Sequence, residues 1–425
     1  MDFKDTLFIF TTSPAGLGHI RVMNAIKSAR PQSINSVDLG ILDLKANRIH
    51  DLGSRVKFFV KLTEFYQTNP IAEKFVTHFY TNYLKKHTKN IIKDFTNIAQ
   101  THPDAKKWVV ISTHFALAYG IAAAKEILEK SLGIKIYLTV VVTDASPQRI
   151  WAVKDADLIF APSIDVKNKL QNFLPPDKRE IIKAISFPIA VRLSQNLTLS
   201  EFQFVVNQLN PSSDQITQIE IPVSGAAVQL DYLQRIIEIL SYKNYEFTVI
   251  GQESLLTKMF FNKLKTLPRV QVSIGVDAWQ TVQYYESLFY QSNRPSIEIT
   301  KPSEQAFKAL LNPRQRGGVI LLLTAPIGRQ EYDNLSFLES YNFMPPLKEN
   351  QEMWNAQDLT KWLVKAKDWR AIRIPEDPKF AASFIIKLKS SGIFYAMLKA
   401  SIPDKADLKT NGVEKIWEEI ISLIS

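Results

Sequence analysis

The sequence contains no cysteine among its 425 residues. This absence excludes disulfide bonds, thiol nucleophiles and cysteine-based zinc sites, and it suits a reducing compartment. No apolar run reaches the roughly 18 residues that a membrane-spanning helix requires. The charged residues Asp2, Lys4 and Asp5 before a short apolar run argue against a signal peptide. We therefore expect a cytoplasmic protein.

Internal repeats and low-complexity segments are also absent, and the hydrophobic content of 46% is typical of a globular protein. A chain of this length can form two ordinary domains with full cores. Its 52 basic and 42 acidic residues give a formal net charge of +10. A basic surface attracts nucleic acid, anionic lipid or a nucleotide substrate. Nucleic acid is the least supported of the three, because no helix-turn-helix, zinc-finger or RNA-recognition signature is present.

A glycine-containing turn lies near the start of the chain, between an apolar strand pattern and a helical pattern. Its sequence is Ser13-Pro14-Ala15-Gly16-Leu17-Gly18-His19. Glycine lets the backbone turn sharply and approach a ligand, and the N–H groups at the start of the next helix suit an anion. His19 would stand at the mouth of that site. A tight turn with a solvent-exposed histidine explains the motif equally well, since Gly-x-Gly alone is a weak signature.

Three more apolar strand patterns follow in the first half of the chain, separated by helical patterns. They cover residues 108–112, 134–142 and 158–161. This alternation predicts a parallel, doubly wound sheet, in which ligands gather at the carboxyl ends of the strands. His19, His114 and Asp144 each follow a predicted strand end, so we expect them to meet at one edge. Taken singly, each histidine could equally be a surface or core residue.

Residues 56–95 combine helical spacing with many aromatic and basic side chains and few acidic ones. This combination is typical of a helix that lies on an anionic membrane. The alternative is that the aromatic side chains form core and the lysines a solvated face. The aromatic residues are Phe58, Phe59, Phe65, Tyr66, Phe75, Phe79, Tyr80 and Tyr83.

A polar stretch over residues 190–214 indicates a domain boundary near residue 194. It holds a short helix that opens with the capping-box pattern Thr198-Leu199-Ser200-Glu201. Strand patterns then alternate with helices again, which predicts a second sheet built like the first. These strands are expected over residues 219–223, 247–251, 270–274, 297–300 and 319–323, with helices over 350–363, 380–398 and 413–424.

The motifs, in this order, resemble those of GT-B glycosyltransferases of the MurG and monogalactosyldiacylglycerol-synthase type, which are glycosyltransferase family 28-like. Gly16-Leu17-Gly18-His19 is similar to the opening glycine-rich loop and histidine of that family, and Ile111-Ser112-Thr113-His114 to its second histidine motif. Thr143-Asp144 resembles the start of a third block, in which Gln148 replaces a family histidine. The block continues with Trp151, Asp157 and Ser163, and Phe187-Pro188-Ile189 resembles the close of the first domain.

Two stretches of the second half carry the resemblance further. Thr300-Lys301-Pro302-Ser303-Glu304 resembles the donor loop of the family, and residues 326–334 resemble its Pro-x-Pro-Gly-Gln-Glu-x-x-Asn motif with the glycine displaced by one. Gln330 and Glu331 at a helix start can hydrogen-bond adjacent sugar hydroxyls, although an acidic first turn also simply matches the helix dipole. Lys308 falls where the family has a ribose-binding glutamate, and Glu304 is the nearest carboxylate.

The resemblance implies an α/β GT-B fold with two Rossmann-like, doubly wound domains that face each other across a cleft. Residues 1–194 would form the acceptor-side domain, with a membrane-facing segment at about 56–95. Residues 195–380 would bind the nucleotide sugar. Residues 381–425 would form C-terminal helices that cross back to the first domain.

The resemblance also implies an activity. A hexose or N-acetylhexosamine would move from a UDP-sugar to a hydroxyl of a lipid or lipid-linked acceptor, with inversion and without a metal or any cofactor beside the UDP-sugar. The protein would be peripheral on the inner face of the cell membrane, on an anionic surface, and would bind no nucleic acid. A non-catalytic nucleotide-sugar-binding scaffold and a UDP-sugar 2-epimerase remain alternatives.

The expected site residues follow from the matched motifs. His19 or Asp144 is expected as the base, with His114 near the acceptor or the diphosphate. On the acceptor side we expect Gln148 and Trp151, and we expect no metal ligand. The expected donor-binding residues are Gly16, Gly18, Ser224, Gly225, Gly251, Lys301, Ser303, Glu304, Gln330, Glu331 and Asn334.

Overall fold

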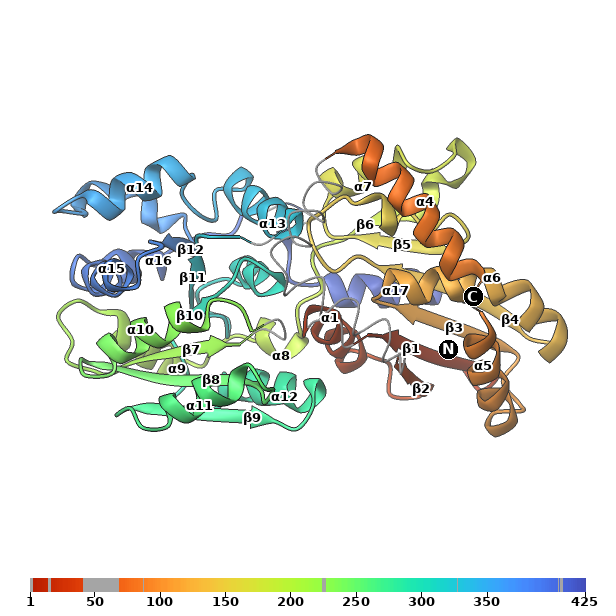
Figure 1. The fold of residues 1–425 in the computed structure, drawn as a ribbon, viewed down its shortest axis with the longest axis horizontal. Helices are drawn as coiled ribbons and strands as arrows, with labels where there is room; N and C mark the ends of the chain where they lie inside the picture. The colour runs from red at the N-terminus through yellow and green to blue at the C-terminus, as the bar shows by residue number, and fades with distance from the viewer. Residues whose placement is uncertain are drawn as a thin grey trace. The chain divides into compact units, whose positions relative to one another are not determined.

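A computed structural model describes residues 3–13, 17–40, 69–86, 88–223, 227–326, 328–403, 405 and 408–425. The chain forms two compact units (Figure 1). Unit 1 comprises Met1–Ala190 and Lys409–Ser425, and unit 2 comprises Val191–Leu408. The first division lies close to the boundary that the polar stretch predicts.

Unit 1 contains a six-stranded parallel sheet in the order β2-β1-β3-β4-β5-β6. The chain leaves β1 to build β2 on one side and then returns to build β3 on the other, so the strand order reverses between β1 and β3. β1 and β3 are buried along nearly their whole length, as expected for central strands covered on both faces. The strands are β1 (Thr6–Thr12), β2 (Asn35–Gly40), β3 (Lys107–Ser112), β4 (Lys135–Val141), β5 (Leu158–Ala161) and β6 (Ile182–Ala184).

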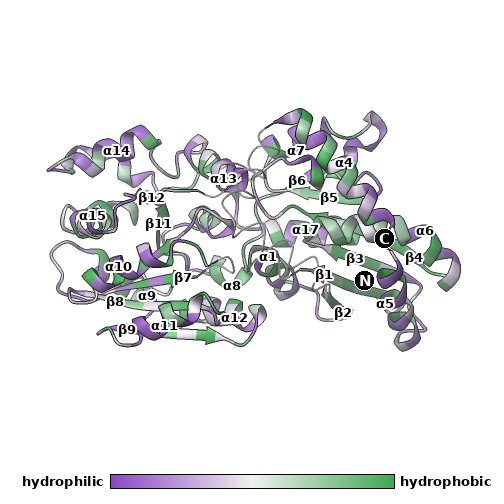
Figure 2. Cartoon of the chain, viewed as in Figure 1, coloured by the Kyte–Doolittle hydropathy of each residue, from purple (hydrophilic) through white to green (hydrophobic). Residues whose placement is uncertain are grey.

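Helices flank this sheet and connect its strands (Figure 1). They are α1 (Leu17–Ser28), α4 (Pro70–Lys86), α5 (Lys89–Thr101), α6 (Phe115–Leu132) and α7 (Ile164–Gln171), with short 3₁₀ turns η1 (Arg149–Trp151) and η2 (Pro176–Ile181). Figure 2 shows the apolar strands in green and the helices with mixed colours, as expected for one buried and one solvated face. Within the described ranges, no helix is both long and apolar enough to span a bilayer.

The two described helices of the aromatic and basic segment, residues 56–95, differ in where their aromatic side chains lie. Phe95 of α5 is fully buried, and its ring centroid lies 5.8 Å from that of Trp108. By contrast, Phe75, Phe79 and Tyr83 of α4 are 60%, 71% and 56% exposed. The core interpretation therefore holds for Phe95 of α5, whereas these three aromatic side chains of α4 are exposed; whether α4 lies on a membrane stays a prediction. The part of the segment before residue 69 lies outside the described residues.

Unit 2 contains a second six-stranded parallel sheet, in the order β12-β11-β10-β7-β8-β9, with the reversal between β7 and β10. Its strands are β7 (Thr217–Pro222), β8 (Tyr245–Gln252), β9 (Val270–Gly275), β10 (Ile297–Thr300), β11 (Val319–Leu323) and β12 (Ala371–Ile374). Its helices include α8 (Val191–Ser194), α9 (Leu199–Leu209), α10 (Leu230–Leu240), α11 (Thr257–Leu264), α12 (Ala278–Leu288), η3 (Glu304–Leu310), α13 (Arg329–Ser340) and α14 (Leu347–Asn355). Two doubly wound sheets confirm the predicted fold class.

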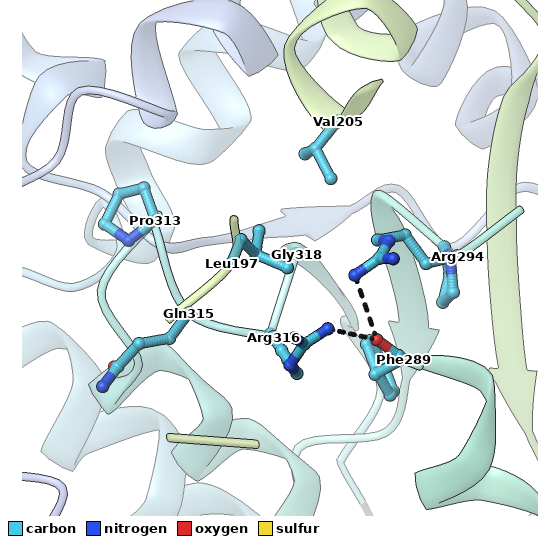
Figure 3. A pocket seen from close by; sticks show the side chains of 10 residues that line it. Leu197, Val205, Phe289, Arg294, Pro313, Gln315, Arg316 and Gly318 are labelled. Carbon is cyan, nitrogen blue, oxygen red and sulfur yellow. Dashed lines mark hydrogen bonds between the residues drawn. The ribbon is translucent and has the colours of Figure 1, made fainter. Parts of the chain in front are cut away.

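The start of unit 2 is fixed by an ionic cluster around Glu201, the acidic partner of the predicted capping box in α9. Arg294 and Arg316 reach its carboxylate at 2.7 and 3.0 Å. Burial favours the neutral acid, but hydrogen bonds from Arg316, the Thr198 N–H and Arg294 outweigh this and hold the pKa of Glu201 at about 2. Both guanidinium groups also donate to the Phe289 carbonyl, beside a pocket of unit 2 (Figure 3).

Among the described helices after β12, α17 (Gly412–Ile424) alone belongs to unit 1. Its Trp417 ring lies 5.5 Å from the Phe8 ring, and its indole N–H donates to the Ile26 carbonyl at 2.9 Å. The preceding helices α15 (Pro378–Ser390) and α16 (Ile393–Met397) stay in unit 2, because their apolar faces belong to its core. The returning segment is therefore shorter than the predicted residues 381–425.

Gly412 allows α17 to approach the backbone of unit 1. A methyl group at this position would lie 2.1 Å from the Ser186 carbonyl oxygen. We expect Gly412→Ala to lower the free energy of unfolding by about 2 kcal/mol, the usual cost of forcing a group into a packed interior. Urea unfolding followed by circular dichroism measures this. Gly40→Ala is the matched control, since nothing lies within 4 Å of its added carbon. Equal transitions for both variants would contradict the packing described here.

Candidate functional site

The carboxyl ends of β1, β3 and β4 bring predicted site residues together in unit 1. β3 pairs with both β1 and β4, so the segments that follow these strands are neighbours. The ring centroids of His19 and His114 lie 5.1 Å apart in an edge-to-face arrangement. The Thr143 hydroxyl oxygen lies 3.1 Å from Nδ1 of His19. The two histidines thus share one edge with the Thr-Asp motif, as the sequence predicts.

Hydroxyl groups at the strand ends fix the backbone of both histidines. The Thr113 hydroxyl donates to the His19 carbonyl at 3.0 Å and lies 2.9 Å from the Thr12 hydroxyl. The Ser112 hydroxyl donates to the His114 carbonyl at 3.0 Å. Thr113 and Ser112 are fully buried, so these bonds are shielded from water and hold the loops in place.

Aromatic rings enclose the histidine pair. The Phe115 ring stacks on His114 with a centroid distance of 4.8 Å and meets Trp151 at 5.5 Å and 90°. Trp151 is fully buried, and its ring lies 6.2 Å from that of His19. The Trp151 indole N–H has no hydrogen-bond acceptor in the described part of the chain. Phe115 was not predicted as a site residue, although its place directly after His114 at the start of α6 was a usable signal.

Asp144 follows Thr143 at the same edge and is 6% exposed. Its carboxylate accepts a 2.8 Å hydrogen bond from the Ser146 N–H, which shapes the turn after β4. The side-chain amide of Gln148 donates to the Ser146 hydroxyl at 3.3 Å. The half-buried Gln148 therefore supports the turn that carries Asp144.

Unit 2 gathers a second set of predicted residues at the carboxyl ends of β10 and β11. These strands pair, so Lys301 after β10 lies near the start of α13 after β11. The Lys301 ammonium is 3.0 Å from the Glu331 carboxylate, and the Asn334 side chain donates to the Pro302 carbonyl at 3.1 Å. Glu331 and Asn334 are buried, whereas Lys301 is half-buried. Gly328 begins the helix with a φ of 82°, which glycine adopts without strain.

The remaining predicted donor residues lie in different environments. Gln330 is exposed whereas Glu331 is buried, so these two adjacent residues lie in different environments. Ser303 and Glu304 are half-buried at the start of η3. Gly251 in β8 is buried, and an added β-carbon there would lie 2.7 Å from the Phe261 ring. Gly18 lies in the first turn of α1; Gly16, Ser224 and Gly225 lie outside the described residues.

Lys308 points into the interior of unit 2. Its ammonium is paired with Glu298 of β10 and lies 3.8 Å from the centroid of the Phe289 ring. Glu298 also accepts a hydrogen bond from the Tyr285 hydroxyl at 3.0 Å. A carboxylate in a central strand needs such a partner, because an unpaired buried charge is costly. This pairing explains the lysine at a position where the resembled family has a glutamate.

No protein-family model matches the chain. The processive diacylglycerol beta-glucosyltransferase of Bacillus mycoides is 21% identical over 391 residues, which cover 88% of this chain and 91% of that protein. The crystal structure of UDP-GlcNAc 2-epimerase from Neisseria meningitidis bound to UDP-GlcNAc aligns with a TM-score of 0.51 and 13% identity, covering 98% of this chain and 99% of that one.

The S. aureus MnaA–UDP co-structure aligns with a TM-score of 0.50 and 10% identity, over 99% of this chain and 97% of that one. The chain has the GT-B fold. The GT-B fold places two doubly wound sheets in one chain, as units 1 and 2 show. The resemblance of the motifs to family 28-like GT-B glycosyltransferases agrees with this fold and with the glucosyltransferase relative.

The buried pair in unit 2 provides a test of the role assigned to Lys308. We expect Lys308→Met to lower the free energy of unfolding by about 3 kcal/mol, because Glu298 would be left buried without its cation. The double variant Lys308→Met with Glu298→Gln should recover part of this loss. Lys135→Met, which removes a mostly exposed partner of Glu129, is the control and should cost under about 1 kcal/mol. Urea unfolding of the wild type and the three variants measures these losses. Equal losses of unfolding free energy for Lys308→Met and Lys135→Met would contradict the assignment.

Proposed function

We propose that this GT-B-fold protein is a glycosyltransferase that moves a hexose or N-acetylhexosamine from a UDP-sugar to a hydroxyl of a lipid or lipid-linked acceptor, with inversion. One observation carries the proposal. In each unit a motif residue follows a strand at which the order reverses, β1 and β3 for His19 and His114 and β10 for Lys301, and doubly wound sheets bind ligands at such points. The name of the relative, a diacylglycerol glucosyltransferase, supports a lipid acceptor such as diacylglycerol.

The reaction forms a bond between the acceptor oxygen and the anomeric carbon and breaks the bond from that carbon to the diphosphate. The diphosphate leaves with the bonding electron pair, and a base takes the acceptor proton. His19 is our first candidate for the base. Because Thr143 occupies its Nδ1 at 3.1 Å, Nε2 is the nitrogen that would take the proton. That requires Nδ1 to donate to the threonine hydroxyl.

Two neighbours complete the proposed acceptor side. Asp144 is the second candidate for the base, and its buried carboxylate lies next to Thr143 in the chain. The edge-to-face contact with His114 fixes the His19 ring, and His114 would lie near the acceptor or the diphosphate. Gln148 and Trp151 would line the acceptor side. Holding the acceptor hydroxyl and the base in the reactive orientation can supply much of the rate enhancement of a transferase.

The proposed donor side uses unit 2. Lys301 would stabilise the negative charge that develops on the departing diphosphate, together with backbone N–H groups of the predicted loops at Gly16, Gly18, Ser224 and Gly225. Glu331 and Asn334 would bind sugar hydroxyls, since a carboxylate accepts two hydrogen bonds and a side-chain amide both donates and accepts. Gly251, Ser303, Glu304 and Gln330 remain proposed contacts. Because the chain supplies its own cation, we propose that turnover needs no metal or cofactor.

Release of UDP tests the proposed activity. We expect UDP and a glycolipid from UDP-glucose or UDP-N-acetylglucosamine with dispersed diacylglycerol, and no change with EDTA. His19→Ala should lower kcat by about 100-fold or more, the usual contribution of a general base. Asp144→Asn identifies the base by comparison: the variant with the larger loss of kcat marks it.

The alternatives give different results in the same assay. Binding of a UDP-sugar without turnover would indicate a nucleotide-sugar-binding scaffold. A 2-epimer or free sugar formed without any acceptor would indicate an epimerase. Failure to bind any UDP-sugar would contradict all three interpretations.

The contact between Thr143 and His19 gives a separate prediction. Thr143→Val should lower kcat/KM by about tenfold, because a partly buried hydrogen bond to the histidine would be lost, and Thr143→Ser should retain most of the wild-type kcat/KM. The KM for the UDP-sugar should stay the same in both. Nitrogen NMR of the His19 ring should show the proton on Nδ1 in the wild type and a mixture of tautomers in the valine variant. A single unchanged tautomer would show that Thr143 does not position the ring.

A further inference from the structure

We infer that the pocket near the start of unit 2 binds one small monovalent anion of about the size of chloride, held by the guanidinium groups of Arg294 and Arg316 (Figure 3). The inference does not rest on the proposed function, because binding of this ion requires neither a UDP-sugar nor an acceptor. The ion would join three segments of unit 2, namely α9, the loop before β10 and the loop before β11.

The pocket combines apolar walls with two buried cations. Arg294 and Arg316 are only 6% and 9% exposed, so both side chains belong to the interior of unit 2. None of the described residues that line the pocket is acidic. An anion in the pocket therefore meets positive charge without a competing carboxylate. The apolar part of the lining includes Leu197, Val205, Pro295 and Pro313.

The two guanidinium groups have more donors than the protein uses. Each guanidinium carries five N–H donors. Arg294 contacts the Glu201 carboxylate at 2.7 Å and the Phe289 carbonyl at 3.4 Å. Arg316 donates twice to the same carboxylate, at 3.0 and 3.1 Å, and once to the same carbonyl at 3.1 Å. The Nε–H of both arginines has no acceptor in the described part of the chain, and a buried donor without an acceptor is costly.

The charges beside the pocket do not balance. Glu201 is ionised at neutral pH, because hydrogen bonds outweigh its burial and hold its pKa at about 2. Both arginines stay protonated, so this cluster has one positive charge in excess. Arg192 and Glu286, which also act on the neighbouring Tyr290, have opposite signs and leave the excess unchanged. One monovalent anion would neutralise the cluster, whereas a water molecule would not.

Size limits the ligand to a single small ion. The pocket has a volume of about 10 Å³, enough for one particle of about the size of a water molecule. Chloride is only slightly larger than water, whereas sulfate, phosphate and gluconate are much larger. The apolar walls also favour an ion that loses its hydration shell readily, as chloride does more easily than phosphate.

Thermal unfolding in chloride tests the site. At constant ionic strength, replacement of gluconate by chloride should raise the melting temperature by about 4 °C at about ten times the dissociation constant, since the ion binds only the folded state. Bound chloride should also broaden the NMR line of chloride in solution, which measures binding directly. If chloride neither raises the melting temperature nor shows a broadened line, only water occupies the pocket and the inference is overturned.

Two variants of α9 separate the pocket from the basic surface of the protein. Val205→Ile adds one carbon to a residue that lines the pocket, and it should abolish both the chloride response and the line broadening. Val206→Ile adds the same carbon at the next position, which is half-buried and does not line the pocket, and it should retain both. An equal chloride response in the two variants would indicate general screening of surface charge and overturn the site.

Charge variants test the role of the guanidinium groups. Arg294→Gln removes the excess charge and should abolish the chloride response. Glu201→Gln raises the excess to two charges and should tighten chloride binding severalfold, although it removes the carboxylate of the capping box. Both variants should melt at a lower temperature in gluconate, so their opposite effects on chloride binding separate loss of the site from loss of stability. Weaker binding in Glu201→Gln, or unchanged binding in Arg294→Gln, would show that the arginines do not hold an anion.

Discussion

The reversal of strand order in each sheet is the constraint on which the candidate site depends. The chain leaves β1 in one direction and returns to β3 in the other, and β7 and β10 have the same relation in unit 2. Where the strand order reverses, the loops leave two adjacent strands in opposite directions. This leaves room for a ligand outside the carboxyl ends of these strands, because the helices on the two faces of the sheet do not fill it. The His19 and His114 pair stands at this point in unit 1. In unit 2, Lys301 follows the reversal strand β10 and pairs with Glu331, which follows the neighbouring strand β11. Side chains at both edges are held by polar partners, because a buried polar group without one is costly.

Apolar strands that end abruptly in polar residues made much of this arrangement predictable. The sequences of β1, β3 and β4 are apolar enough for these strands to be identified from sequence. Their parallel pairing then brings together His19, His114 and the Thr-Asp motif, which follow their carboxyl ends. Lys301 and Glu331 were both expected on the donor side from the resemblance, and the pairing of β10 with β11 brings them together. Strand patterns could not predict Phe115 or the contact between Thr143 and His19, because these depend on how helix starts pack after the strands have paired.

Contacts with residues distant in the sequence explain the remaining differences between the predictions and the structure. Helical periodicity in the aromatic and basic segment predicts a stripe but not the side on which it lies, so α4 and α5 could differ only in the fold. Lys308 could be understood only once Glu298 was found buried beside it. α15 and α16 have apolar faces that either unit could cover, and the core of unit 2 covers them. Local pattern fixes what an element is, whereas its partners depend on residues far away in the sequence.

Hydrogen–deuterium exchange with and without UDP tests most directly the claim that the strand reversal in unit 2 binds the nucleotide. We expect UDP to slow exchange in the backbone after β10, at residues 300–304, and at the start of α13, at residues 328–334. The opposite edge of the same sheet, at the amino ends of β7 and β10, should exchange as before. Protection confined to that opposite edge, or no protection at saturating UDP, would contradict the account.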